Sequence, residues 1–245
     1  MSHSKFRNKN VILCLIFLFS LLSSSSHAST TDQALRAIEK NDFKTALKEL
    51  LPLAEKGDKD AQFLMGMLYD AGKGVPQDPS IAASWYKKAA QQNHSIAQLY
   101  LGILYHSGEG VKKDYREAVR WFQPAADKGN DQAQFFLGWM YADGKGVSKD
   151  ENKAIGLLTK SAVQKNTRAM GILSTLLFSR FPQTKADQDL IDAYVWSHLA
   201  AEYDPIQFST TTRMMIEKYC TEEQIKKAKK SMEDWKLKWR NSPPK

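Results

Sequence analysis

The pattern of apolar, small and polar residues along this chain repeats every 36 residues. "GKGVPQDPSIAASWYKKAA" from Gly72 reappears as "GEGVKKDYREAVRWFQPAA" from Gly108 and as "GKGVSKDENKAIGLLTKSA" from Gly144. Each copy predicts two helices, which in the first unit are helix A over 60–69 and helix B over 79–91. No single pair can bury its apolar face alone, so we expect neighbouring pairs to stack.

The helix boundaries carry their own signals. Asp78 can accept hydrogen bonds from the free amides at the start of helix B, and Pro79 sits where a missing N–H costs nothing. The first loop glycine ends helix A, and the second lets the chain reverse tightly. A phosphate-binding loop is the alternative, but no strand precedes it and no Lys-Ser/Thr pair follows it. The expected C-cap residues are Gly57, Asn93 and Gly129. The next place in successive units is occupied by Asp58, His94, Asn130 and Asn166, most of which can cap the following helix A.

Small residues inside the helices predict close helix crossings. Ala61, Gly66, Ala82 and Ala89 recur at the same places in the later units, where backbones can approach closely. Tyr69, Trp85 and Trp121 are expected to fill the space beside them.

The repeat continues in weaker form at both ends. Upstream, Asp42, Ala46 and Ala54 match helix B positions, and Thr30 with Gln33 can form a capping box. Downstream, Ser174 replaces the helix glycine, "SRFPQTKAD" replaces the glycine loop, and Asp189 is the counterpart of Asp78. The last segment predicts a capping helix, whose apolar stripe is Ile225, Ala228, Met232, Trp235 and Trp239.

The three regular units resemble the Sel-one-like repeat, an α/α solenoid family related to tetratricopeptide repeats. The matching segments are "AQFLMGMLYDAGKGVPQDPSIAASWYKKAA", "AQLYLGILYHSGEGVKKDYREAVRWFQPAA" and "AQFFLGWMYADGKGVSKDENKAIGLLTKSA". "CTEEQIKKAKKSMEDWKLKW" is similar to the closing helix of bacterial members. The resemblance implies a right-handed superhelical, all-α solenoid that binds other proteins, often in bacterial envelope or host-contact processes. Exported members that carry a disulfide in every repeat have been linked to β-lactam binding, but those cysteines are missing here.

These features predict five segments. Residues 1–28 read as a secretory signal peptide, with a basic start, an apolar run from 11 to 22 and a cleavage site near Ala28. An uncleaved anchor is the alternative. The remaining segments are an atypical helix pair (29–57), three regular repeats (58–165), a degenerate repeat (166–203) and C-terminal capping helices with a basic tail (204–245). We therefore expect an exported protein, periplasmic or secreted.

Charge and cysteine content narrow the function classes. Removing 1–28 lowers the net charge from +8 to +5, and the excess lies in 213–245, which has ten Lys/Arg and five Asp/Glu. Sparse aromatic residues in that tail and the expected export argue against nucleic acid binding. Cys14 leaves with the signal peptide, so Cys220 remains alone and is expected to be buried rather than reactive.

No constellation of residues predicts catalysis, a cofactor or a metal. His94, His106 and His198 belong to different units without metal-ligand spacing, and we expect surface or capping roles for them. No serine lies in a nucleophile-elbow sequence, and Cys220 has no evident base.

A helical wheel predicts a partner-binding face on helix A. Ala61, Met65, Leu68 and Tyr69 fall on one arc, and a second set of residues falls opposite. If helix A lines the concave side of the array, the candidate binding residues are Phe63, Met67, Asp70, Leu99, Ile103, His106, Phe135 and Trp139, followed by Ala142. The alternative is that a helix apolar all round is simply buried, most plausibly at 63, 99 and 135.

The sequence thus favours a non-enzymatic interaction scaffold that binds another protein through its concave face. One alternative is a protein that binds or acts on cell-wall material, such as peptidoglycan or β-lactams. A second is attachment of the basic tail to an anionic membrane surface.

Overall fold

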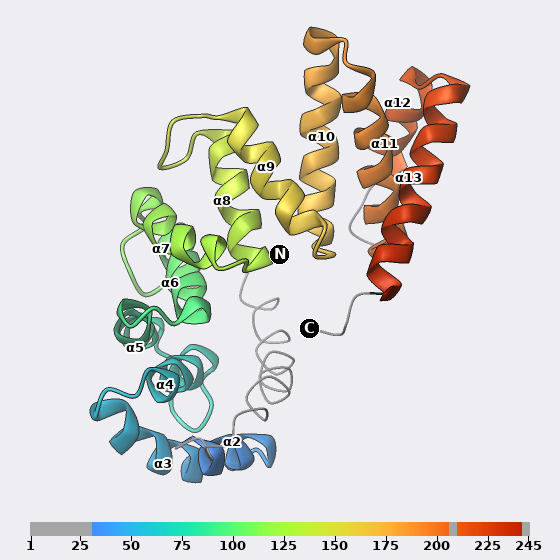
Figure 1. The fold of residues 1–245 in the computed structure, drawn as a ribbon. Coiled ribbons are helices and arrows are strands. Elements are labelled where there is room, and N and C mark those ends of the chain that lie inside the picture. The colour runs from blue at the N-terminus through green and yellow to red at the C-terminus, as the bar shows by residue number, and fades with distance from the viewer. Residues whose placement is uncertain (1–30, 206–209, 242–245) are drawn as a thin grey trace. The chain divides into compact units, whose positions relative to one another are not determined.

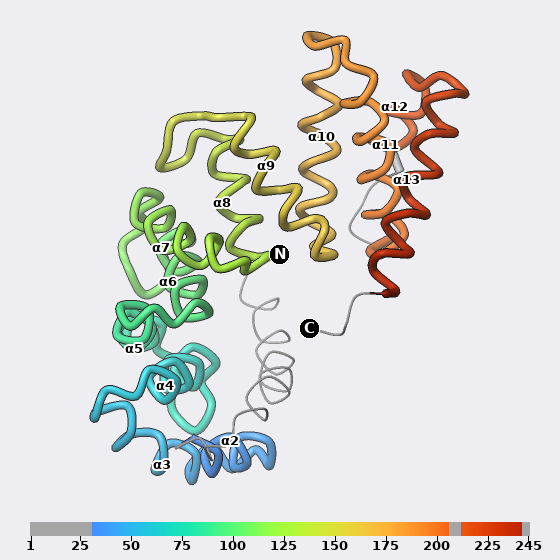
Figure 2. The backbone as a smooth tube through the Cα atoms, in the orientation of Figure 1, coloured from blue at the N-terminus to red at the C-terminus, as the bar shows by residue number. Residues whose placement is uncertain are grey.

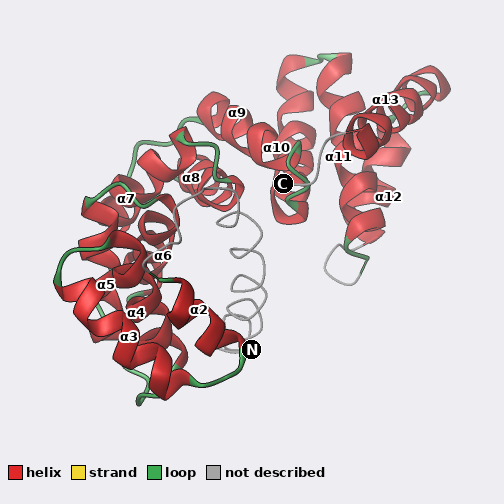
Figure 3. Ribbon diagram, turned by 60° about the horizontal axis from the view of Figure 1, so that its bottom comes forward, coloured by secondary structure: helices red, strands yellow, loops and turns green. Residues whose placement is uncertain are grey.

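The computed structural model describes residues 31–205 and 210–241, and every regular element within those ranges is an α-helix (Figure 3). The predicted all-α fold is therefore confirmed. The signal peptide prediction and the Thr30–Gln33 capping box fall at least in part outside the described residues. The helices run in the order α2 (Asp32–Glu39), α3 (Phe43–Glu55), α4 (Lys59–Ala71), α5 (Pro79–Gln91), α6 (Ser95–Ser107), α7 (Tyr115–Asp127), α8 (Asp131–Asp143), α9 (Glu151–Ala162), α10 (Thr167–Thr184), α11 (Asp187–Tyr203), α12 (Thr210–Tyr219) and α13 (Glu222–Asn241) (Figure 1).

The chain divides into two compact units. The first runs to Pro124 and the second begins at Ala125, so the division falls within α7. Within each unit most helices pack against the next one along the chain, such as α4 on α5 and α10 on α11, whereas α12 and α13 both pack on α11; the tube through the Cα atoms makes this easy to follow (Figure 2). The right-handed superhelix and the five segment boundaries stay predictions.

The predicted helix caps are confirmed. The Asp78 carboxylate accepts from the backbone N–H groups of Ser80 and Ile81 at 2.9 and 3.0 Å. Asp42, Asp114 and Asp150 cap α3, α7 and α9, while Asp58, His94, Asn130 and Asn166 cap α4, α6, α8 and α10 in the same way. At Gly57, Asn93 and Gly129 the φ angles are 98°, 62° and 86°, as a left-handed turn between helices requires.

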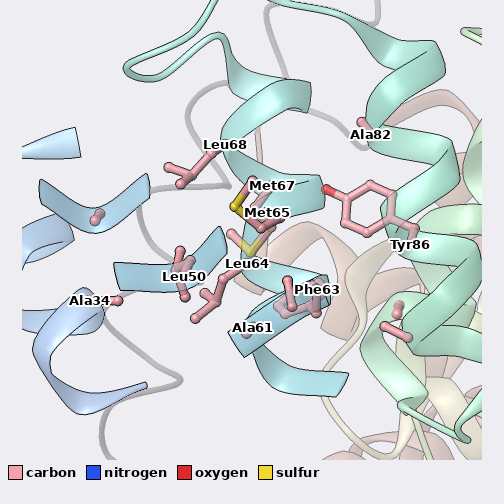
Figure 4. Packing of buried hydrophobic residues seen from close by; sticks show 14 of the residues in the cluster. Ala34, Leu50, Ala61, Phe63, Leu64, Met65, Met67, Leu68, Ala82 and Tyr86 are labelled. Carbon is pink, nitrogen blue, oxygen red and sulfur yellow. The ribbon is translucent and has the colours of Figure 1, made fainter. Parts of the chain in front are cut away.

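The helix glycines let helices A and B approach, but a different side chain covers them than expected. A Cβ at Gly66 would lie 2.6 Å from the Tyr86 ring, and one at Gly102 would lie 2.6 Å from the Phe122 ring. Tyr86 is fully buried and reaches from α5 toward Met65 and Met67 on α4 (Figure 4). The residue that fills this crossing is therefore the one after Trp85, which is only half-buried at the edge of the core.

The second loop glycine joins one repeat to the one before it. Gly110 has a φ of 71°, and a Cβ on it would lie 2.2 Å from the carbonyl carbon of Pro79 at the start of α5. The Gly110 carbonyl accepts a hydrogen bond from Ser80 Oγ at 2.9 Å. This glycine is thus required by contact with the preceding repeat as well as by the tight reversal.

The fourth helix pair departs from the expected loop. α10 continues to Thr184, so most of "SRFPQTKAD" is helical rather than a loop, and α11 begins at Asp187. Asp189 is consequently no N-cap residue. It lies buried within α11, where it accepts hydrogen bonds from Arg180 Nε at 3.0 Å and from Thr184 Oγ1 at 2.8 Å. This cluster ties the extra turn of α10 to α11.

The predicted capping role of the last helix is confirmed within the second unit. Ala228 and Trp239 of α13 are buried, and the rest of the apolar stripe packs against the core formed by α9, α10 and α11. Thr221 and Gln224 form a reciprocal capping box, with bonds of 3.2 and 2.8 Å. The indole N–H of Trp239 donates to the Val163 carbonyl at 2.7 Å and so satisfies an end group of α9.

Candidate binding pocket

One helix A position that was predicted to bind a partner lies in the core in all three repeats. Phe63, Leu99 and Phe135 are all buried, as the alternative interpretation of these positions held. Phe63 stacks on His94 with ring centroids 4.6 Å apart and also contacts Tyr86 and Tyr100. Packing against the neighbouring helices accounts for its apolar character, because this helix A position faces the next helix pair rather than solvent.

The remaining predicted residues of the first unit differ in burial. Met67 and Asp70 are buried in α4, whereas Ile103 and His106 in α6 are half-buried. The His106 ring packs against Tyr115 with centroids 5.4 Å apart. Only Ile103 and His106 of this group therefore present surface, and their partner binding stays a prediction.

Trp139 lines a pocket in the second unit. The pocket has a volume of about 540 Å³ and is formed by α8, α10, α11, α12 and the loop after α8. Its apolar lining comes from Trp139 and Ala142 of α8 and from Ile172 and Leu176 of α10. The volume falls in the range of about 300–1,000 Å³ that is typical of ligand-binding pockets.

Three of the hydroxyl groups of the pocket are turned toward their own helices. Ser174 Oγ and Thr175 Oγ1 donate to the Gly171 carbonyl at 2.8 and 3.1 Å, and Ser197 Oγ donates to the Tyr194 carbonyl at 2.9 Å. Each hydroxyl proton is thereby used, while the oxygen lone pairs can still accept. These groups suit a ligand N–H better than a ligand anion.

The charged groups of the pocket are mainly basic. Lys149 and Arg213 line it, together with one carboxylate, Asp143, which accepts a bond from Lys145 Nζ at 2.8 Å. Lys145 Nζ also lies 4.8 Å from the centre of the Trp139 ring, within range of a cation–π contact. The carboxylate is thus already neutralised by a lysine.

Arg213 makes only a long ion-pair contact with Glu217 on the same helix, α12. Its Nε atom is 4.0 Å from Glu217 Oε1, too far for a hydrogen bond. Glu217 Oε1 instead accepts a hydrogen bond from His198 Nε2 at 2.9 Å. His198 is half-buried, and its ring stacks on Tyr194 with centroids 3.8 Å apart while Nε2 joins α11 to Glu217 on α12.

The sequence argument missed the side of the pocket made by α10 and α12. The 36-residue period, carried one unit beyond Trp139, reaches Thr175, and this signal could have placed α10 at the pocket. Nothing in the sequence indicated that α12 would bring Arg213 to the same place, because that depends on how the chain turns after α11.

Other candidate chemistry is structural. His94 caps α6 through Nδ1, and its Nε2 lies 3.4 Å from Asp60 Oδ1, an interaction that lowers the pKa of the Asp60 carboxyl. Cys220 is half-buried, and burial together with the nearby Glu217 raises its thiol pKa to about 11. Over 31–205 and 210–241 the structure holds no group of three His, Cys, Asp or Glu residues arranged for a metal ion. None of the helices in these ranges combines the length and apolarity needed to span a bilayer.

The family follows from the repeats themselves. The Sel1 repeat model matches residues 59–94, 95–130 and 131–166, in register with the helix pairs α4–α5, α6–α7 and α8–α9. The chain is a Sel1 repeat protein. Proteins of this family are generally protein-interaction scaffolds and typically non-catalytic. No curated protein sequence matches this Sel1 repeat protein significantly.

Solved structures of the same family share its fold. A Sel1 repeat protein from Oxalobacter formigenes is 27% identical, with a TM-score of 0.63 and 70% of each chain covered. A protective antigen present in uropathogenic Escherichia coli strains, which displays an SLR fold, is 31% identical with a TM-score of 0.68. That match covers 83% of this Sel1 repeat protein but only 45% of the antigen chain.

Proposed function

We propose that this Sel1 repeat protein is an exported, non-enzymatic adaptor that binds another protein through surface on its A helices, in a bacterial envelope or host-contact process. The observation that carries the proposal is the pocket at Trp139, a concave apolar site with polar points in a protein of the Sel1 repeat family. Partner-binding proteins of this kind anchor aromatic and aliphatic groups in such sites.

Two half-buried A-helix positions support the same proposal. Ile103 and Trp139 occupy equivalent places 36 residues apart, and neither is completely enclosed by its own unit. The tail is less suited to membrane attachment, because the apolar stripe of α13 already packs on the core of the second unit.

A pull-down from the native cell with the mature chain as bait tests the proposal. Ile103→Glu together with Trp139→Glu should abolish capture of a specific protein while circular dichroism shows unchanged helicity. Ile81→Glu is the matched control, since Ile81 is an exposed apolar residue on the B helix α5. Capture that survives the double substitution would count against the A-helix surface, and saturable binding or turnover of peptidoglycan fragments without any protein partner would favour the cell-wall alternative.

A further inference from the structure

The Trp139 pocket has a charge pattern that selects a class of partner segment. Its two basic residues come from different elements, Lys149 from the loop after α8 and Arg213 from α12. Its only carboxylate, among the described residues that line it, is bound to Lys145. The charged side chains that line the pocket are therefore more basic than acidic, and they accompany an apolar lining.

Arg213 gives the strongest single indication that the pocket binds a carboxylate. Its Nε atom is buried, and no described residue accepts a hydrogen bond from it. A buried N–H donor without an acceptor is unfavourable even though 34% of the Arg213 side chain is exposed, and a carboxylate is the acceptor that fits the planar guanidinium best. The Glu217 carboxylate, 4.0 Å from this Nε atom, is bonded to His198 at 2.9 Å.

Resting on the proposed function, we propose that the pocket binds an internal acidic peptide segment, in which an aromatic or aliphatic side chain is flanked by Asp or Glu. The apolar side chain lies against Trp139, Ile172 and Leu176. Carboxylates on either side of it meet Arg213 and Lys149, two positive points that a single terminal carboxylate would not satisfy. Backbone N–H groups of the segment donate to the hydroxyl oxygens of Ser174 and Ser197, whose protons are already used within their helices.

Selection from a random 12-residue peptide library displayed on phage, with residues 29–245 immobilised, tests this proposal. Because the peptides are fused at their C-terminal ends, none of them presents a free C-terminal carboxylate. We expect enrichment of sequences with Asp or Glu beside Phe, Trp or Leu. A synthetic peptide of the enriched sequence should bind about tenfold more weakly to Arg213→Gln, the loss of one charge-assisted hydrogen bond. Lys160→Gln, an exposed change on α9, should leave its affinity unchanged.

Enrichment of neutral or basic peptides, no enrichment above background, or equal affinity for the Arg213→Gln variant would each overturn the proposal. These results are separable from failure of the proposed function. If the native partner is captured equally by Arg213→Gln but is lost with Ile103→Glu, the adaptor function stands and the acidic-segment proposal falls. If acidic peptides bind through Arg213 but no native protein is captured, the pocket assignment stands and the adaptor function falls.

Discussion

The side-chain amide of Gln62 donates a hydrogen bond to the Ala54 carbonyl at 3.0 Å and so ties α4 to the end of the preceding helix. Its oxygen accepts from Gln92 Nε2 at 2.9 Å, and Gln92 also donates to the Gly57 carbonyl. Gln134 repeats this arrangement with Ala126 and Gln164 in the second unit. The recurrence of this glutamine in the 36-residue period therefore has a physical cause: its amide gives a second donor to a carbonyl at the end of the preceding helix, which already accepts a backbone N–H from Gly57 or Gly129.

Replacing Gln62 with Leu should destabilise the first unit by about 1–3 kcal/mol, because the buried Ala54 carbonyl and the Gln92 amide both lose a partner. Denaturant unfolding followed by circular dichroism measures the change. Gln91→Ala, an exposed change one residue before Gln92, should have an effect within about 0.5 kcal/mol. Equal stability of the two variants would show that the amide contributes little.

Gly102→Ala should destabilise the protein by about 1–3 kcal/mol, since the added methyl group would lie 2.6 Å from the Phe122 ring. The matched control is Gly156→Ala in α9, where a Cβ has no neighbour within 4 Å. That change should stabilise the helix by about 0.5–1 kcal/mol. Thermal unfolding measures the midpoint temperature of both variants. A shift of the same sign in both would contradict the close helix crossing at Gly102.

Trp239→Phe should cost about 1 kcal/mol, because the ring stays while the hydrogen bond to Val163 is lost. Trp239→Ala should cost about 3–5 kcal/mol through the cavity it leaves. Leu237→Ala, at an exposed position of the same helix, serves as the control. If all three variants unfold at the same denaturant concentration as the unmodified chain, α13 does not cap the second unit as described.

The ion pair between Arg180 and Asp189 predicts acid sensitivity. Hydrogen bonding from Arg180 lowers the pKa of the Asp189 carboxyl below its ordinary 3.8. A lowered pKa in the folded state stabilises the fold above the unfolded-state pKa, and this contribution is lost as the pH falls through the folded-state pKa. Asp189→Asn should therefore be less stable than the unmodified chain by about 1.5–3 kcal/mol at neutral pH, with the gap narrowing toward about pH 3. Urea unfolding across this pH range measures the difference in stability between the two chains. A difference that does not change with pH would contradict the prediction.

Cys220 should react slowly with iodoacetamide near neutral pH. The thiolate is the reactive form, and a pKa of about 11 leaves very little of it at pH 8. The rate should keep rising as the pH approaches 11, whereas urea-unfolded protein should reach its plateau at lower pH. Mass spectrometry of the alkylated chain follows both rates, and a plateau near pH 8 in the folded protein would refute the raised pKa.

Much of the fold could be predicted because its signals are local. Asp78 caps α5 with its own side chain, and Gly57 turns the chain through a backbone conformation that it adopts without strain. The wheel argument for the binding face was less informative. It placed Phe63 opposite the core arc, yet Phe63 is buried, because helix A contacts both its own helix B and the next pair.

The sequence by itself determined the helical repeat, the places where helices begin and end, and the helix that closes the array, since each depends on residues close together in the chain. Only the tertiary structure decided that Tyr86 rather than Trp85 covers Gly66, that Asp189 binds Arg180 instead of capping a helix, and that Arg213 reaches the Trp139 pocket. Those outcomes depend on how helices cross and on contacts between residues distant along the chain, which a repeating pattern does not encode.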